Sequence, residues 1–435
     1  MIEFKYSPEA NIDLDEQYLK MAKEEISSIQ GVIKKWGYED VRASLNLPFD
    51  ESILRDSREM CEKLSEVDVL VVIWIWGSDL GTKAVYDAIK WKYANSLNEK
   101  KVYFIDTTDD ELMGQFLQVL TNEIKAWKKL ALNPISKSWS TAETIANTKV
   151  LLDFLKTNQS DWQNNVVITT WEWSKFWNYW KENNFHLLSL PDQVGWRYSV
   201  FSNVWIFPLM FAWVDCEALL KWACDALING QEFDLNVNQS LKASLVIFTQ
   251  HLTRTRIFDL FLFSCQFENV WKWYRQLMWE SLWKEDDMDW KKVFTGITPS
   301  VSIGSTDLHS IAQLYLWWPQ DKMVMFVTIK ERVEKLMKSD KWLDDIVKNL
   351  DWKSLSQVMR TFSWGTMWAF GWKWIPFINV EFDAINEYNV WYFLQFNMIK
   401  MMILGKLFNV KWWDQPNVEE YKIISRKMLA GEINC

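Results

Sequence analysis

The sequence predicts an α/β protein built on doubly wound parallel sheets, and three observations support this fold class. Runs of β-branched and other apolar residues, such as Val69–Ile73 and Val102–Ile105, are typical of strands buried on both faces of a sheet. Segments with the periodicity of amphipathic helices alternate with these runs. The composition, 49% hydrophobic and 24% charged, is globular. Strands that alternate with helices predict parallel sheets covered by helices.

The length of 435 residues suits two domains. We expect a helical N-terminal segment over residues 1–49 and a first α/β domain over residues 50–200. A second α/β domain is expected over residues 201–400, and a helical C-terminal segment over residues 401–435.

The first domain is expected to alternate between strands and helices. In chain order these elements are a helix at Ser57–Leu64, a strand at Val69–Ile73, a helix at Thr82–Tyr93, a strand at Val102–Ile105, a helix at Glu111–Leu120, a strand–loop–helix unit around Ile135–Glu143, and a strand at Val166–Thr169. Ligands of such sheets bind at the carboxyl ends of the strands, where Ser78 and Ser136–Thr141 both fall.

The second domain is expected to begin near Phe201. Its predicted elements are helices at Val204–Val214, Leu219–Leu227 and Glu268–Met278, strands at Leu245–Phe248, Arg256–Phe263 and Val324–Val327, and a last helix at Asn417–Leu429. The apolar stretch Val390–Val410 approaches the length of a membrane span, but polar residues that include Gln395 and Lys400 interrupt it. We therefore predict a buried helix there.

Charge and cysteine usage exclude several classes of partner. The net charge of −9 argues against a nucleic-acid or anionic-membrane partner. The five cysteines are scattered without CxxC spacing, which favours reduced thiols in the cytoplasm and argues against a zinc site; they are Cys61, Cys216, Cys224, Cys265 and Cys435. The first ten residues contain no apolar signal core, so a cytoplasmic protein is expected.

The stretch Ile135–Glu143 is rich in short polar side chains just before a predicted helix. Its hydroxyl and ammonium groups belong to Ser136, Lys137, Ser138, Ser140 and Thr141. The first N–H groups of a helix lack intrahelical partners and carry a positive dipole end, so such a cluster can hold an anion, typically phosphate. The alternative is an ordinary Ser/Thr helix cap, with Glu143 in the first turn.

Two residue counts are abnormal. The chain contains 31 Trp but only 13 Gly, which is about 3% Gly where about 7% is usual. An α/β protein of this size needs more glycine than that for its turns and helix ends.

Six motifs resemble those of the glucose-6-phosphate isomerase family, which is built from two sugar-isomerase (SIS) domains. In order they are W-I-W-G-S (74–78), S-K-S-W-S-T (136–141), V-G-W-R-Y-S (194–199), Q-L-M-W-E-S-L-W-K (276–284), S-T-D-L-H-S (305–310) and D-Q-P-N-V-E-E-Y-K (414–422). The family patterns are close to G-I-G-G-S, S-K-S-G-T-T, V-G-G-R-Y-S, G-E-S-x-G-K, S-T-D-L-H-S and D-Q-P-x-V-E-x-x-K. The resemblance, over roughly residues 60–430, implies two SIS-type domains and interconversion of glucose 6-phosphate and fructose 6-phosphate through a cis-enediolate.

The resemblance also implies roles for particular residues. Glu280 is the expected base that moves a proton between C1 and C2. The expected role of Arg197 is to stabilise the enediolate with a permanent positive charge, the alternative being a structural ion pair. His309 and Lys422 are expected to open the sugar ring, and Gln276 to orient the substrate.

The resemblance implies that the phosphate group of the substrate binds to two loops of the first domain, each of which precedes a predicted helix. Ser78, Ser136, Ser138 and Thr141 would bind it, and Lys137 would contribute chiefly through its backbone. By the same resemblance His309 reaches into the active site of a neighbouring subunit, which implies a homodimer. No cofactor and no metal are implied.

Two other functions stay open. Another SIS-type isomerase, or one that also accepts mannose 6-phosphate, would use the same phosphate and enediolate contacts. A non-catalytic sugar-phosphate sensor would need the phosphate loop but not Glu280, Arg197, His309 and Lys422 together, and all four are present.

The departures from the family patterns are of one kind: tryptophan occupies positions where the family has glycine. This holds at Trp74, Trp76, Trp139, Trp196 and Trp283, and we expect it also at Trp213, Trp222, Trp279, Trp318 and Trp391. Our hypothesis is that a UGA codon, read as glycine by the source cell, is rendered here as tryptophan. The fold should survive this change, but Trp74, Trp76, Trp139 and Trp196 should crowd the substrate pocket.

Overall fold

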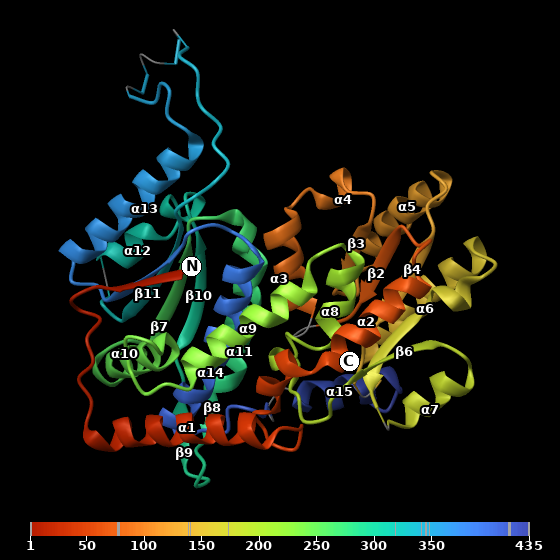
Figure 1. Ribbon diagram of the computed structural model, residues 1–435, viewed down its shortest axis with the longest axis horizontal. Helices are drawn as coiled ribbons and strands as arrows, with labels where there is room; N and C mark the ends of the chain where they lie inside the picture. The colour runs from red at the N-terminus through yellow and green to blue at the C-terminus, as the bar shows by residue number, and fades with distance from the viewer. Residues whose placement is uncertain are drawn as a thin grey trace. The chain divides into compact units, whose positions relative to one another are not determined.

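The computed structural model consists of two compact units that each contain a parallel sheet (Figure 1). Unit 1 comprises Met1–Ser28 and Asp225–Trp412, and unit 2 comprises Ile29–Cys224 and Trp413–Cys435. The structure describes residues 2–75, 79–137, 139, 141–172, 174–317, 319–340, 342–343, 346–347, 349–415 and 419–433.

Unit 2 is organised around parallel strands. Its three-stranded sheet has the order β3-β2-β4, and a second pair of parallel strands is β5-β6. A parallel bridge between Leu132 and Val166 joins β4 to the start of β5. The strands are β2 (Val69–Ile73), β3 (Lys101–Ile105), β4 (Leu130–Pro134), β5 (Val167–Trp171) and β6 (His186–Leu190).

Unit 2 also contains eight whole helices among its described residues. They are α2 (Glu51–Lys63), α3 (Asp79–Lys90), α4 (Ala94–Leu97), α5 (Asp110–Lys125), α6 (Ala142–Asn158), α7 (Lys175–Glu182), α8 (Asn203–Phe211) and α15 (Glu419–Leu429), with short 3₁₀ turns η1 (Ala43–Phe49), η2 (Trp162–Asn165) and η3 (Trp196–Tyr198). Helix α8, which is apolar nearly all round, packs against both α2 and α3.

Unit 1 contains a five-stranded sheet with the order β1-β12-β11-β7-β10. The first strand is antiparallel to β12, whereas the other neighbours are parallel. The strands are β1 (Ile2–Tyr6), β7 (Ile257–Leu262), β10 (Thr298–Ile303), β11 (Lys322–Ile329) and β12 (Phe377–Phe382), and β8 (Lys284–Asp286) forms an antiparallel hairpin with β9 (Lys292–Thr295).

The remaining helices belong to unit 1 or cross its boundary. They are α1 (Glu16–Lys35), α9 (Cys216–Gly230), α10 (Gln239–Thr253), α11 (Glu268–Leu282), α12 (Ala312–Trp317), α13 (Leu355–Trp372) and α14 (Glu387–Leu407), with 3₁₀ turns η4 (Cys265–Phe267) and η5 (Thr306–Leu308). The boundary between the units falls within α1 and within α9. The predicted α/β class with parallel sheets is confirmed.

Two of the predicted elements are wrong. Leu245–Phe248 was expected to be a strand but lies within α10, which is buried nearly all round, and an apolar run of that kind does not distinguish a buried helix from a strand. The N-terminal segment was expected to be helical, yet Ile2–Tyr6 forms β1. Its side chains alternate between half-buried and exposed, which is the period of a strand rather than that of a helix.

The predicted buried helix at Val390–Val410 is confirmed as α14, whose side chains are almost all buried. Lys400 is fully buried in it, with its ammonium 4.6 Å from the ring centroid of Tyr274 and 5.0 Å from that of Phe396. Burial lowers the pKa of Lys400 well below its ordinary value. Among the described residues, no helix is both long enough and apolar enough to cross a membrane.

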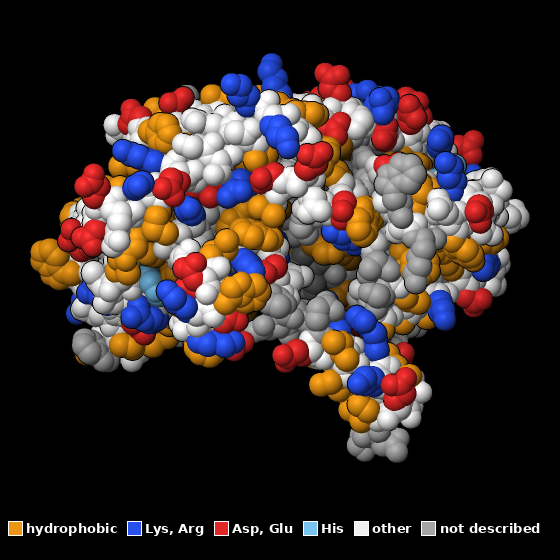
Figure 2. Space-filling model, turned by 90° about the horizontal axis from the view of Figure 1, so that it is seen from below, with side chains coloured by type: hydrophobic (Ala, Val, Ile, Leu, Met, Phe, Trp, Pro, Cys, Tyr) orange, Lys and Arg blue, Asp and Glu red, His pale blue; other side chains and the backbone are white. Residues whose placement is uncertain are grey.

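The surface carries both signs of charge. Figure 2 shows acidic and basic side chains interspersed on one face, with exposed hydrophobic side chains between them. Among the described residues no disulfide joins Cys61, Cys216, Cys224 or Cys265, and Cys435 lies outside those residues.

A buried carboxyl group ties β10 to the sheet of unit 1. Asp259 on β7 is fully buried, and its Oδ1 accepts hydrogen bonds from Ser300 Oγ at 2.7 Å and from Ser302 Oγ at 3.1 Å. Burial raises the pKa of Asp259 to about 6, although the hydrogen bond from Ser300 opposes this shift. The raised pKa shows that desolvation outweighs these hydrogen bonds.

This raised pKa makes the stability of the protein depend on pH. The folded state binds the proton of Asp259 more tightly than the unfolded state, so the stabilisation is fully present below the ordinary pKa of 3.8 and is lost as the pH rises through about 6. In an Asp259→Asn variant this loss, about 3 kcal/mol for a shift of about two units, should disappear. Urea unfolding of both proteins at a series of pH values measures it.

The exposed Asp289 offers a matched control, because Asp289→Asn removes the same charge at the surface. Parallel stability curves for the parent and Asp259→Asn across this pH range would contradict the interpretation.

Candidate functional site

The predicted phosphate loop follows β4 at the carboxyl edge of the sheet in unit 2. Ser136 is buried, and its N–H donates to the carbonyl of Thr169 at 3.1 Å. The hydroxyl of Thr170 donates to the Ser136 carbonyl at 2.7 Å, and Ser136 Oγ accepts from the N–H of Trp139 at 3.0 Å. The end of β5 therefore fixes the start of this loop.

Lys137 and Thr141 complete the described part of the loop. The ammonium of Lys137 donates to the carbonyl of Asp192 at 2.6 Å, and burial lowers the pKa of Lys137. Thr141 is the N-cap residue of α6, but its side chain makes no capping hydrogen bond. The alternative of an ordinary side-chain cap at Thr141 is therefore not observed.

Several predicted residues lie outside the described part of the chain. They are the phosphate-binding candidates Ser78 and Ser138 and the glycine-position candidates Trp76 and Trp318. The strand that precedes Ser78 is placed, however. Ile73 at the end of β2 pairs with Pro134 at the end of β4, so both loops start at the same edge of the sheet.

Arg197 lies on η3, in the loop after β6, and is buried. Its Nη1 donates to Gln415 Oε1 at 2.6 Å, and its Nη2 donates to the backbone carbonyl of Asp414 at 3.2 Å. Two motifs that are far apart in the sequence, V-G-W-R-Y-S and D-Q-P-N-V-E-E-Y-K, thus meet in unit 2. The sequence analysis assigned no role to Gln415. The one feature that could have indicated a role is its position in the last motif, D-Q-P-N-V-E-E-Y-K.

Two of the tryptophans at expected glycine positions meet beside Arg197. Trp74, directly after β2, and Trp196 have ring centroids 5.2 Å apart. The ring of Trp139 instead packs against Trp180 at 5.0 Å within the hydrophobic core of unit 2. The expectation that Trp139 crowds the substrate pocket with its ring is therefore wrong, because the ring points into the core.

Glu280 and Gln276 lie one turn apart on α11 of unit 1. The amide Nε2 of Gln276 donates to Glu280 Oε1 at 2.9 Å. Gln276 is buried and Glu280 is half-buried, so the amide binds one carboxylate oxygen from the buried side of α11. Helical residues at i and i+4 lie on the same face, which explains this pairing.

His309 follows η5, after β10, and its side chain is exposed. The loop that carries it is fixed by Asp307, whose Oδ2 accepts from the N–H of Ile303 at 2.6 Å and whose Oδ1 accepts from Ser310 Oγ at 2.9 Å. Lys422 lies on α15 of unit 2 and is half-buried. Asp307, which the sequence reasoning did not single out, holds the loop of His309 through these two hydrogen bonds.

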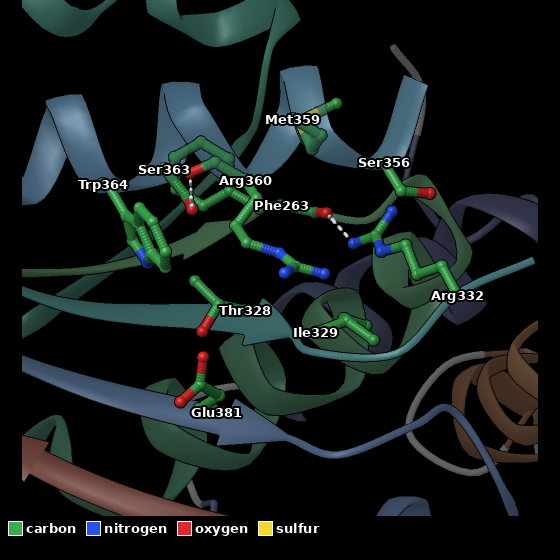
Figure 3. Close-up of a pocket in the computed structure, with 10 residues that line it drawn as sticks. All are labelled: Phe263, Thr328, Ile329, Arg332, Ser356, Met359, Arg360, Ser363, Trp364 and Glu381. Atoms are coloured by element: carbon green, nitrogen blue, oxygen red, sulfur yellow. Dashed lines mark hydrogen bonds between the residues drawn. The ribbon is translucent and has the colours of Figure 1, made fainter. Parts of the chain in front are cut away.

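A pocket in unit 1 lies outside the predicted site residues (Figure 3). It is lined in part by Arg332 and Arg360, with Thr328 from β11 and Glu381 from β12. Arg332 donates to the carbonyl of Phe263, and burial lowers the pKa of Arg332. No group of three or more His, Cys, Asp or Glu side chains is arranged to hold a metal among the described residues.

Comparisons with known proteins give one consistent match. The family model for phosphoglucose isomerase matches residues 56–315. A glucose-6-phosphate isomerase of Thermus thermophilus is 30% identical over 392 residues, which cover 89% of this chain and 90% of that protein.

Solved structures agree with this match. A hypothetical protein of Thermus thermophilus has a TM-score of 0.86 at 26% identity and covers 98% of this chain and 100% of its own. A glucose-6-phosphate isomerase of Chlamydia trachomatis has a TM-score of 0.80 at 17% identity, covers 99% of this chain and 88% of its own, and shows the same fold.

The contact between Arg197 and Gln415 can be tested through stability. A Gln415→Leu variant removes the acceptor of a buried guanidinium, and a hydrogen bond to a charged group contributes about 1.5–3 kcal/mol. We expect the free energy of unfolding in urea to fall by about that amount. Gln193→Leu is the matched control, because Gln193 is exposed and surface changes cost within about 0.5 kcal/mol. Equal effects of the two substitutions would contradict the assignment.

Proposed function

Since this chain belongs to the phosphoglucose isomerase family, we infer that it interconverts glucose 6-phosphate and fructose 6-phosphate. We also propose a role in this reaction for each of its candidate site residues. The reaction moves a carbonyl group between C1 and C2, so the enzyme is an intramolecular oxidoreductase, and the step belongs to glycolysis and gluconeogenesis. The observation that carries this function is the family match over residues 56–315.

Glu280 is the proposed base. Its carboxylate takes the proton from C2 of the open-chain glucose phosphate, and the electron pair forms the C1–C2 double bond of the cis-enediolate. The proton returns to C1 while the hydroxyl proton of O2 passes to O1, which gives the fructose phosphate. The amide of Gln276 holds one carboxylate oxygen at 2.9 Å, which fixes the orientation of the group. A fixed base needs less reorganisation when the proton moves.

Arg197 is the proposed stabiliser of the enediolate. Its guanidinium stays charged at any working pH, and burial strengthens its attraction for a developing negative charge. Gln415 and the carbonyl of Asp414 orient the guanidinium through neutral acceptors. A preoriented charge of this kind is a large source of transition-state stabilisation.

The loop at the start of α6 is the proposed phosphate site, with Ser136 and Thr141 assisted by Ser78 and Ser138. Because the Thr141 side chain does not cap α6, the first-turn N–H groups can face an anion. The ammonium of Lys137 is bound to the Asp192 carbonyl, which supports a contribution through its backbone N–H.

His309 and Lys422 are the proposed ring-opening pair. His309 is exposed in a single chain, and this supports its use in the active site of a second subunit. The proposal therefore includes a homodimer and a cytoplasmic location. Mannose 6-phosphate stays an alternative second substrate, because its phosphate and enediolate would make the same contacts.

Glu280→Gln tests the base directly. The amide cannot accept the C2 proton, so turnover should fall by about 10²–10⁴-fold while sugar-phosphate binding is kept. The assay is the exchange of the C2 proton of glucose 6-phosphate with deuterated water, followed by NMR. Glu285→Gln is the matched control, because it neutralises another half-buried carboxylate on the neighbouring strand β8. If Glu280→Gln exchanged the C2 proton at the rate of the parent protein, Glu280 would not be the base.

Complementation tests the sharing of His309 between subunits. Mixing inactive Glu280→Gln chains with inactive His309→Ala chains should restore activity, because one site of each heterodimer then contains both intact residues. The measurement is activity before and after subunit exchange. A mixture that forms heterodimers but stays inactive would count against the proposal.

A further inference from the structure

We propose that the protein made by its source cell carries glycine at eight tryptophan positions where the backbone is left-handed. These positions are Trp36, Trp91, Trp127, Trp139, Trp213, Trp290, Trp352 and Trp374, with φ between 52° and 72°. The proposal does not depend on the activity, because it is argued from backbone conformation.

The residue types at positive φ are the first observation. Among the described residues, the non-glycine residues in this region are these eight tryptophans, Asn184, Asn349, Asn409 and Phe294. Asparagine tolerates the left-handed region because its short polar side chain bonds locally, whereas a bulky side chain there is a genuine outlier. Tryptophan accounts for 31 of 435 residues but for eight of these twelve positions.

Hydrogen bonds show that several of these positions lie in a type of helix end that requires a left-handed residue. After α5 the N–H of Trp127 donates to the carbonyl of Ile124 at 2.9 Å, and the N–H of Lys128 donates to that of Glu123 at 3.0 Å. This pair of bonds defines the Schellman helix end, whose left-handed residue is usually glycine. Trp213 after α8 and Trp374 after α13 make the same two bonds.

The chain itself provides the comparison. The same helix end occurs after α7 with Asn184, after α14 with Asn409 and after α15 with Gly431 in the left-handed position. Within the described ranges, this turn therefore carries glycine once, asparagine twice and tryptophan three times. Glycine and asparagine are the residues that the turn selects.

At three of these positions the indole is largely exposed to solvent. The side chains of Trp127, Trp352 and Trp374 are 96%, 66% and 69% exposed. An exposed ring removes little apolar surface from water, so burial does not offset the backbone strain. A glycine would lose nothing there and would adopt the conformation freely.

Two of the left-handed positions were also expected to be glycine from the resemblance to the family, and one of them lies in a quoted motif. Trp139 has a φ of 52° in the phosphate loop, where the family pattern S-K-S-G-T-T has glycine, and Trp213 was also expected at a glycine position. The backbone conformation and the resemblance to the family therefore each indicate glycine at these positions. A single cause covers all eight positions, namely a UGA codon that the source cell reads as glycine.

Mass spectrometry of the protein isolated from its source tests the identity of the residues. Peptides that span the eight positions should contain glycine, and the intact mass should fall below 52.0 kDa by at least the mass difference of eight Trp-to-Gly replacements. Tryptophan in the peptides at 127, 213 and 374 would overturn the proposal.

Recombinant variants test the backbone argument separately. Trp127→Gly should raise the melting temperature by about 2–4 °C through relief of the strained turn, whereas Trp127→Ala keeps a Cβ atom and should not. Trp368→Gly is the matched control, because Trp368 is 67% exposed in the interior of α13, where glycine disfavours the helix. If alanine and glycine at 127 raised the melting temperature equally, the argument from strain would fail.

Discussion

The left-handed turn that ends its helices is the constraint on which this fold depends. In an α/β unit this turn decides where the next strand begins. Helix α5 turns at Trp127 and β4 starts at Leu130, and α13 turns at Trp374 and β12 starts at Phe377. In both cases only a short link joins turn and strand. A one-residue change in the length of this connection would therefore shift the register of the strand that follows, which flips its side chains to the other face.

The energetic scale shows why the residue at these turns matters. A non-glycine residue in the left-handed region costs about 1–2 kcal/mol. Eight tryptophans there would cost on the order of 8–16 kcal/mol, which is as large as the about 5–15 kcal/mol that keeps a typical protein folded. Glycine removes this strain, so the residue type at the left-handed positions decides whether the fold retains a margin of stability.

Much of the fold could be predicted because its central strands are apolar on both faces. Val69–Ile73 was assigned from its β-branched residues alone, and β2 has those bounds and is buried throughout. Strand β10 was missed because its polar residues Ser300 and Ser302 face the buried Asp259, so the sequence shows no apolar run there. The assignment of a strand to Leu245–Phe248 failed for the opposite reason, since α10 is as apolar as a buried strand.

The site was predictable where it depends on local spacing and unpredictable where distant segments meet. Gln276 and Glu280 lie on one helix, and an i,i+4 spacing brings them together in any α-helix. Gln415 approaches Arg197 across 218 positions of sequence, and no local pattern encodes such a contact.

These two contacts nevertheless follow the same physical logic. In one a neutral amide donates to a carboxylate, and in the other a neutral amide oxygen accepts from a guanidinium. A charged partner at the same place would fix the side chain equally well, but it would cancel part of the charge that the chemistry needs. In each contact the amide orients the charged group and adds no charge of its own. For the proposed reaction, which moves a proton from a weak carbon acid and stabilises the resulting anion, groups held in a fixed orientation reduce the reorganisation that the chemistry needs.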